Sequence, residues 1–140
     1  SYGRESLTEL TKALEDYRDD LVVIVAGYTN LMEKFFESNP GLKSRFNTFI
    51  SFNDYSIDEL TRIFTYTCDR NDYTIEDEAI EKIHNLLEAK LKEQEDHFSN
   101  GRFIRNLFDD ITMNQSKRLS KLTGDIAKET LMLITKDDVF

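Results

Sequence analysis

The sequence predicts an α/β layer over residues 1–54, followed by an all-α bundle over residues 55–140. Two observations predict this division. In the first part, helical periodicity alternates with short apolar runs that are typical of buried strands. In the second part, apolar residues recur only at helical spacing, as in a small helical bundle. The change between the two patterns falls near Asp54.

The first part predicts helix, strand, helix and strand in that order. Residues 4–17 place leucines three and four positions apart, which predicts an amphipathic helix. The unbroken apolar run at residues 21–26 is typical of a strand that is covered on both faces in a parallel sheet. Asn30 and Glu33 have the spacing of a capping box, so we expect Asn30 to begin a short helix. Residues 47–52 predict a second strand.

The second part predicts three helices and a short final one. Ser56 and Glu59 form another capping-box pattern ahead of the first helix. Thr74 is the expected N-cap of the second helix, and Asn100-Gly101 opens the third. A short helical segment is expected within residues 126–133.

Composition excludes several classes of function. The chain has 140 residues with 27 acidic and 18 basic side chains, and its net charge of −9 argues against a nucleic-acid-binding face. No apolar run approaches the roughly 18 residues of a membrane span. The single cysteine, Cys68, lies in the apolar stripe of a predicted helix and fits a core position in a reducing, cytoplasmic protein. His84 and His97 lack the spacing of metal ligands, so no metal site is expected.

Three groups of polar residues stand where chemistry is possible. Tyr28, Thr29 and Asn30 follow a predicted buried strand, and ligands of open α/β sheets bind beyond such strand ends. The alternative is that Asn30 only caps its helix and that Tyr28 packs under a loop. Arg45 has a permanent charge that suits a phosphoryl group, but from the local sequence alone the favoured interpretation is an ordinary exposed arginine before a strand.

Two arginines, Arg102 and Arg105, lie in the predicted first turn of the third helix of the bundle. The helix dipole disfavours cations there, while free backbone N–H groups favour an anion. An anion site is therefore one interpretation. The other is that acidic residues, such as Asp109 four positions after Arg105, neutralise the pair.

Three motifs in this order resemble the AAA+ ATPases of the CbbX and stage V sporulation protein K group. They are V-V-I-V-A-G-Y at residues 22–28, N-P-G-L-x-S-R-F at residues 39–46 and R-x-x-R-N at residues 102–106. The resemblance covers essentially the whole chain. It implies that residues 1–54 are the C-terminal part of an AAA+ parallel-sheet core and that residues 55–140 are its helical lid.

The resemblance also implies roles for these residues. Asn30 corresponds to the sensor-1 region, with Tyr28 and Thr29 as alternatives, and Arg45 corresponds to the arginine finger that reaches the nucleotide of a neighbouring subunit. Arg102 corresponds to sensor 2, and Arg105 is the second candidate. The implied full-length protein is a cytoplasmic ATP hydrolase that uses ATP and Mg²⁺, forms a ring, expected to be a hexamer, and remodels a protein client.

The phosphate loop of such enzymes is missing from this sequence. No G-x-x-x-x-G-K-[ST] motif occurs, and the Walker A, Walker B and pore-loop segments are expected upstream of residue 1. We therefore expect this chain alone neither to bind ATP tightly nor to hydrolyse it. The alternative from another class of function is a self-contained interaction module, in which an acidic helix over residues 74–95 docks onto a partner without nucleotide chemistry.

Overall fold

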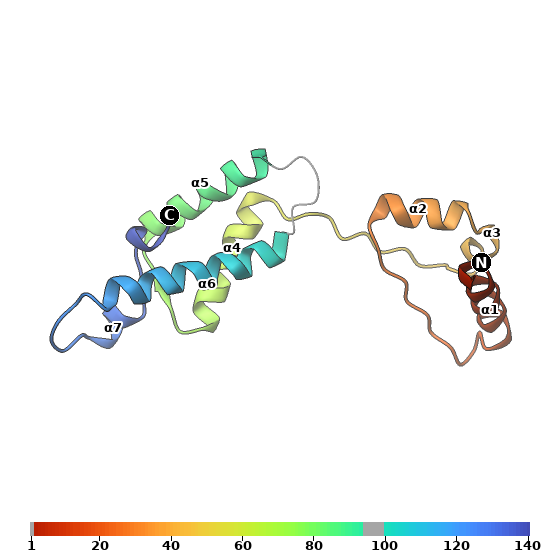
Figure 1. Ribbon diagram of the computed structural model, residues 1–140, viewed down its shortest axis with the longest axis horizontal. Coiled ribbons are helices and arrows are strands. Elements are labelled where there is room, and N and C mark those ends of the chain that lie inside the picture. Colours follow the sequence, from red (N-terminus) through yellow and green to blue (C-terminus); the bar gives the residue numbers. More distant parts are fainter. Residues whose placement is uncertain (1, 94–99) are drawn as a thin grey trace. The chain divides into compact units, whose positions relative to one another are not determined.

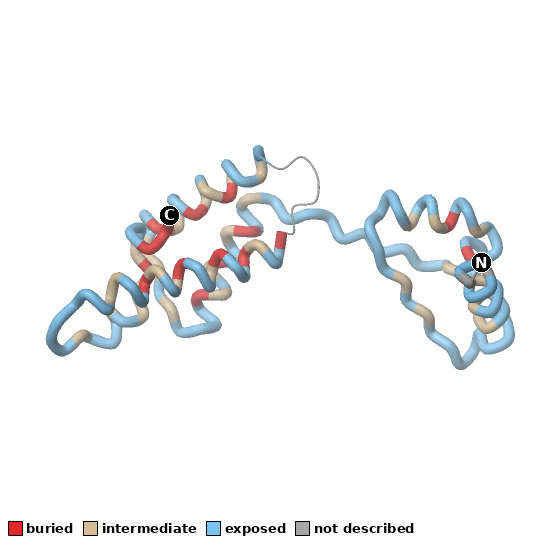
Figure 2. Tube along the Cα trace, in the orientation of Figure 1, coloured by how far each residue is buried: buried red, intermediate tan, exposed pale blue. Residues whose placement is uncertain are grey.

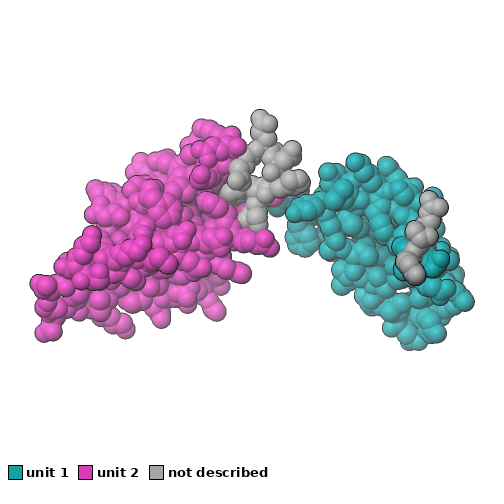
Figure 3. Space-filling model, in the orientation of Figure 1, with its two compact units in different colours: residues 1–53 teal, residues 54–140 magenta. Residues whose placement is uncertain are grey.

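The computed structural model describes residues 2–93 and 100–140. The chain divides into two compact units, residues 1–53 and residues 54–140, which Figure 3 shows in different colours. This division lies one residue from the predicted change near Asp54. Each unit is described below by itself.

Unit 1 is a small helical unit with few buried residues. Its helices, in chain order, are α1 (Tyr2–Asp16), α2 (Thr29–Glu37) and α3 (Pro40–Lys43). Helices α2 and α3 pack together, and each contributes one buried side chain, Phe36 and Leu42. The Phe36 ring makes edge contacts with the rings of Phe46 and Phe49, with centroids 5.3 and 5.5 Å away. The sequence analysis predicted α1 and the start of α2 to within two residues, but it did not predict α3, where it expected only a connecting segment.

The two strands predicted for unit 1 are wrong in this structure. Residues 21–26 and 47–52 run without regular secondary structure, and Ile24 and Phe52 are 87% and 91% exposed. Val23 and Val25 are half-buried while their neighbours are exposed, so residues 22–25 keep the alternation of an extended chain. A strand needs a neighbouring strand to pair its N–H and C=O groups, and the described residues of unit 1 provide none here.

Unit 2 is a helical bundle with a continuous core. It contains α4 (Ile57–Arg70), α5 (Asp77–Glu93), α6 (Asn100–Leu119), α7 (Lys128–Leu131) and a 3-10 helix (Lys136–Asp138). Helix α4 packs against both α5 and α6, and the 3-10 helix packs against the same two helices (Figure 1). The buried residues lie on the facing sides of these helices (Figure 2). The buried hydrophobic residues on the helices are Leu60, Phe64, Cys68, Ala79, Ile83, Leu87, Ile104, Leu107 and Ile111, and Ile134 and Val139 near the end of the chain complete this core.

A short parallel strand pair also lies in unit 2, although the sequence predicted only helices there. Strand β1 (Thr74–Ile75) pairs with β2 (Leu133–Ile134), in the register Thr74 to Leu133 and Ile75 to Ile134. Thr74 was predicted as the N-cap of the next helix, but it donates its backbone N–H to Met132 instead, and α5 begins three residues later. The end of the chain is thereby tied to the segment between α4 and α5.

The two predicted capping boxes differ in outcome. Ser56 is the N-cap of α4: its hydroxyl accepts from the Glu59 N–H at 3.3 Å, and the Glu59 carboxylate accepts from the Ser56 N–H at 2.9 Å. The hydrogen bonds that the Glu59 carboxylate accepts from the Ser56 backbone N–H and from the Ser56 hydroxyl lower the pKa of the Glu59 carboxyl. The Asn30 box is wrong, because α2 begins one residue earlier and Tyr28 occupies the N-cap position. Asn30 therefore lies inside the first turn, where its Oδ1 accepts from the Leu31 N–H.

An ion pair between Arg118 and the buried Asp138 lies at the C-terminal end of unit 2. Asp138 is fully buried, and its carboxylate accepts from Arg118 Nε at 2.7 Å and Nη2 at 2.9 Å. It also accepts from the Thr135 backbone N–H at 2.9 Å. Burial raises the pKa of Asp138, but the hydrogen bonds from Arg118 and Thr135 outweigh burial, so the pKa is lowered overall. Within the described residues, no helix is both long and apolar enough to cross a membrane.

Candidate functional site

Tyr28, Thr29 and Asn30 lie together where the extended segment of residues 21–27 enters α2. Tyr28 is the N-cap, and its carbonyl oxygen accepts from the backbone N–H groups of Leu31 and Met32. All three residues are exposed. Because Asn30 Oδ1 is held by Leu31, the Nδ2 group is the part of this amide that faces solvent and can donate to an oxygen ligand. The start of α2 can therefore make a polar contact with a ligand. Asn30 does not have the N-cap role that was predicted for it.

Arg45 lies two residues after α3, held by contacts within unit 1. Its Nε donates to Glu15 Oε2 of α1 at 3.1 Å, and its Nη2 lies 3.1 Å from the same oxygen. Its Nη1 donates to the Gly41 carbonyl oxygen at 2.8 Å. Arg45 is exposed, as in the simpler interpretation, but the strand expected after it is unpaired here. It is an oriented guanidinium whose side chain is 31% exposed.

Arg102 and Arg105 lie on exposed positions in the first turns of α6. The described residues contain no ion pair between Arg105 and Asp109, which was the neutralising alternative. The first turn of α6 carries no acidic residue to offset the helix dipole. It is anchored by Asn100, whose Nδ2 donates to the Tyr55 carbonyl oxygen at 3.2 Å. The start of α6 therefore combines two exposed cations with the N-terminal end of a long helix.

The candidate residues form two groups, one in each unit. Tyr28, Thr29, Asn30 and Arg45 belong to unit 1, and Arg102 and Arg105 belong to unit 2.

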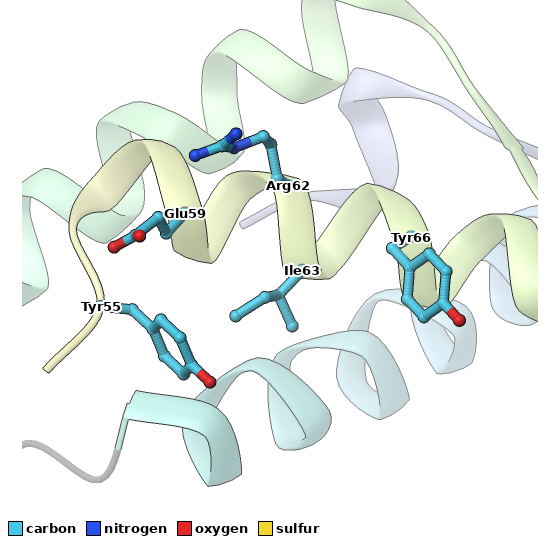
Figure 4. A pocket seen from close by; sticks show the side chains of 5 residues that line it. All are labelled: Tyr55, Glu59, Arg62, Ile63 and Tyr66. Carbon is cyan, nitrogen blue, oxygen red and sulfur yellow. The ribbon is translucent and has the colours of Figure 1, made fainter. Parts of the chain in front are cut away.

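Two pockets lie elsewhere. One, of about 290 Å³, is an open hollow lined by Tyr55, Glu59, Arg62, Ile63 and Tyr66, in and just before α4 (Figure 4). The other, of about 370 Å³, is lined by residues of α1 and by residues 38–42. None of the six candidate residues lines either of these two pockets.

The cysteine and the histidines were the other candidates for chemistry in this chain. Cys68 is buried in α4, and burial raises the pKa of its thiol to about 12, which keeps it protonated and unreactive. His84 Nε2 lies 3.3 Å from the Asp58 carboxylate, and His97 lies outside the described residues. Across residues 2–93 and 100–140, no group of three or more His, Cys, Asp or Glu side chains could hold a metal ion.

Sequence reasoning missed Glu15 as a partner of Arg45. The two residues are 30 positions apart, and the motif that carries Arg45 does not extend to α1. One signal was present in the sequence: Glu15 is an acidic residue near the C-terminal end of a predicted helix, where the dipole disfavours a negative charge. No basic residue lies in that last turn to offset it.

The second unit is an AAA lid domain. A family model described as "AAA lid domain" matches residues 56–140, and the chain therefore belongs to this family. The match confirms the predicted fold class, the C-terminal part of an AAA+ core followed by a helical lid, even though the two strands expected in residues 1–54 are unpaired here.

The similarity to known proteins extends over both units. The chain is 37% identical to Protein CbxX (plasmid) of Cupriavidus necator over 139 residues, which is 99% of this chain and 43% of that protein. It is 37% identical to Protein CbbX of Cereibacter sphaeroides, over 99% of this chain and 44% of that protein. It is 41% identical to Protein CfxQ of Xanthobacter flavus, over 99% of this chain and 43% of that protein. The resemblance to the CbbX group is thus confirmed, and the chain spans less than half the length of these relatives.

Proposed function

We propose that this chain is the sensor, finger and lid part of an AAA+ ATPase that couples ATP hydrolysis to the remodelling of a protein client. The observation that carries the proposal is the AAA lid domain at residues 56–140, together with similarity to CbbX and CfxQ proteins over nearly the whole chain. ATP and Mg²⁺ are then the cofactors of the full-length protein. We place that protein in the cytoplasm as a ring, with six subunits as the expected number.

In this proposal, Arg45 is the arginine finger. Its guanidinium is permanently charged, partly exposed and already oriented by two hydrogen bonds. Such a group, presented to the nucleotide of an adjacent subunit, stabilises the charge that develops on the transferred phosphoryl group. Asn30 is the sensor-1 residue, and its exposed Nδ2 donates to a phosphate oxygen or to the attacking water. Tyr28 and Thr29 remain the alternatives at the same helix start.

Arg102 is the sensor-2 residue of the lid, and Arg105 is the second candidate. Both side chains are exposed on the first turns of α6, where backbone N–H groups also favour an anion. Contact between Arg102 and the bound phosphates would couple the position of the lid to the state of the nucleotide. The segment at residues 53–55, at the boundary between the two units, is the proposed hinge.

The interaction-module alternative gains no support from α5. In the C-terminal half of this helix, Glu88 pairs with Lys92, and Glu93 pairs with Lys90, which neutralises much of its acidic surface. Residues 94 and 95 of the predicted acidic helix lie outside the described residues. The net charge of −9 likewise gives no reason to propose a nucleic-acid partner.

The test of the proposed function is ATP turnover by the full-length protein. Arg45→Ala is expected to lower kcat by a factor of about 10³–10⁵ while leaving nucleotide affinity intact, because the finger acts on the transition state. Lys43→Ala, which removes an exposed cation from α3, is the matched control and should retain turnover. Normal turnover by the Arg45→Ala ring would contradict the finger assignment. The 140-residue chain alone should show no micromolar ATP binding by calorimetry.

A further inference from the structure

We propose that Glu15 is a positioning residue for Arg45, which holds the guanidinium in the orientation that the finger needs. The proposal rests on the proposed function of Arg45. The guanidinium contacts Glu15 at two nitrogens: Nε donates to Oε2 at 3.1 Å, and Nη2 lies 3.1 Å from that oxygen. A third nitrogen, Nη1, is held by the Gly41 carbonyl oxygen at 2.8 Å.

The fold of unit 1 brings Glu15 to this place. Leu7, Thr8 and Thr11 of α1 line the same pocket as residues 38–42, so α1 lies alongside α3 and the turn that precedes it. Glu15, one residue before the end of α1, is then within reach of the chain that leaves α3. The Gly41 carbonyl belongs to α3 itself. Arg45 is thus held by contacts with α1 and α3, two helices that are distant from each other in sequence.

The position of Glu15 is costly for its own helix. A carboxylate near the C-terminal end of a helix faces the negative end of the helix dipole. The last turn of α1 contains no basic residue that would offset this repulsion. The guanidinium of Arg45 supplies the compensating charge from outside the helix, so the electrostatics of α1 favour the observed contact over an unpaired Glu15.

The contacts with Glu15 and Gly41 leave part of the Arg45 guanidinium available for a ligand. A guanidinium carries five N–H donors in a planar fork. The contacts with Glu15 and Gly41 engage Nε, Nη1 and Nη2 once each, so one hydrogen on Nη1 and one on Nη2 can still reach phosphate oxygens. Glu15 therefore orients Arg45 while one N–H donor on Nη1 and one on Nη2 remain for a phosphate. A pre-oriented fork loses less conformational entropy when it meets the transition state, so Glu15 should act on kcat.

The experiment is a set of Glu15 variants in the full-length protein, with ATP turnover as the readout. Glu15→Ala should lower kcat about two- to fivefold with the KM for ATP changed less than twofold, the size expected for an exposed hydrogen-bonded ion pair. Glu15→Gln should retain more than half of kcat, because its amide oxygen still accepts the Nε hydrogen. Asp16→Asn removes a neighbouring exposed carboxylate of α1 and is the matched control, expected to match the wild type.

A second measurement tests whether Glu15 acts through Arg45. In an Arg45→Lys background, which lacks the Nε donor, Glu15→Ala should have less than half its effect on log kcat. In the ¹⁵N spectrum of the 140-residue chain, the Arg45 Nε–H signal should be sharp in the wild type and broadened by exchange with water in Glu15→Ala. These results would support the positioning role.

Several results would overturn it. Unchanged kcat in Glu15→Ala, an equal loss in Asp16→Asn or in Glu15→Gln, or an undiminished loss in the Arg45→Lys background would each contradict positioning by this hydrogen bond. The failure of the proposed function would look different. If Arg45→Ala itself kept normal turnover, the finger assignment would be wrong, whatever the Glu15 variants do.

Discussion

The two units of this chain differ in how much of their apolar surface they cover. Unit 2 buries a continuous set of side chains from α4, α5, α6 and the end of the chain. In unit 1, Phe36 and Leu42 are the only buried hydrophobic residues among those described, and the apolar runs at residues 21–26 and 47–52 are largely exposed. Yet unit 1 carries Asn30 and the oriented Arg45. The stability and the proposed chemistry of the chain are therefore distributed differently between the units.

The difference in buried apolar surface shows which contacts stabilise each unit. Buried apolar area is the main source of stability, and the core of unit 2 is made from residues of that unit alone. In unit 1, an aromatic cluster around Phe36 and the contacts of Arg45 hold the helices together. The AAA lid domain matches unit 2, so the recognised family unit and the well-packed unit are the same. The following predictions compare the two units directly.

The largest expected difference is between two buried phenylalanines. Phe64 of α4 is fully buried and makes an edge contact with Phe108, so Phe64→Ala should lower the free energy of unfolding of unit 2 by about 3–5 kcal/mol. Phe36→Ala should cost unit 1 no more than about half as much, because Phe49, which borders it, is mostly exposed and the site can collapse. Urea unfolding of the intact chain, followed through amide signals of each unit, measures both values. Equal losses would contradict the contrast between the units.

The next effect concerns the buried ion pair of unit 2. Asp138→Asn should destabilise unit 2 by about 2–3 kcal/mol, less than a fully buried pair because the Arg118 side chain is 27% exposed. The pKa of Asp138 is lowered by folding, so its contribution is complete above the unfolded value of about 3.9 and is lost as the pH falls through the lower folded value.

Thermal unfolding between pH 2 and pH 7 measures this contribution. The wild type should lose more stability than Asp138→Asn on acidification, so that the two curves converge. Asp137→Asn is the control, because this neighbouring carboxylate is exposed and no ion pair of the described residues includes it. Parallel curves for the wild type and Asp138→Asn would show that the ion pair contributes nothing.

Local patterns in the sequence predicted most of this fold. Apolar residues at helical spacing predicted the longer helices, and the Ser56–Glu59 pattern predicted the start of α4. Contacts between distant residues were not predictable in this way. The β1–β2 pair has two residues in each strand, too few for a periodic signal, and it joins positions 59 residues apart. Arg118 and Asp138 lie on different elements 20 positions apart, and no motif connects them.

For the candidate site residues, too, local patterns in the sequence did not predict contacts between distant residues. Three candidate positions, Arg45, Arg102 and Arg105, were proposed because they occur in motifs. All three are exposed: Arg45 lies two residues after α3, and the other two lie in the first two turns of α6. The apolar run at residues 21–26 has the composition of a buried strand, and the strand prediction was wrong because a strand forms only when another strand pairs with it. A sequence pattern does not specify that partner. Glu15 was missed because its partner is determined by the packing of α1 against the α3 segment.

The smallest expected effect is the difference in lost stability between substitutions at the two predicted capping boxes, Ser56 and Asn30. Ser56→Ala should cost unit 2 about 1 kcal/mol, since it removes the acceptor for the Glu59 N–H at the start of α4. Asn30→Ala should change the stability of unit 1 by less than about 0.5 kcal/mol, because Tyr28 occupies the N-cap and the Asn30 side chain bonds only its neighbour Leu31. Amide exchange in the first turns of α4 and α2 measures the two losses. If Asn30→Ala leaves α2 stable but impairs ATP turnover of the full-length protein, the residue is retained for contact with the ligand, since its helix does not need it as a cap.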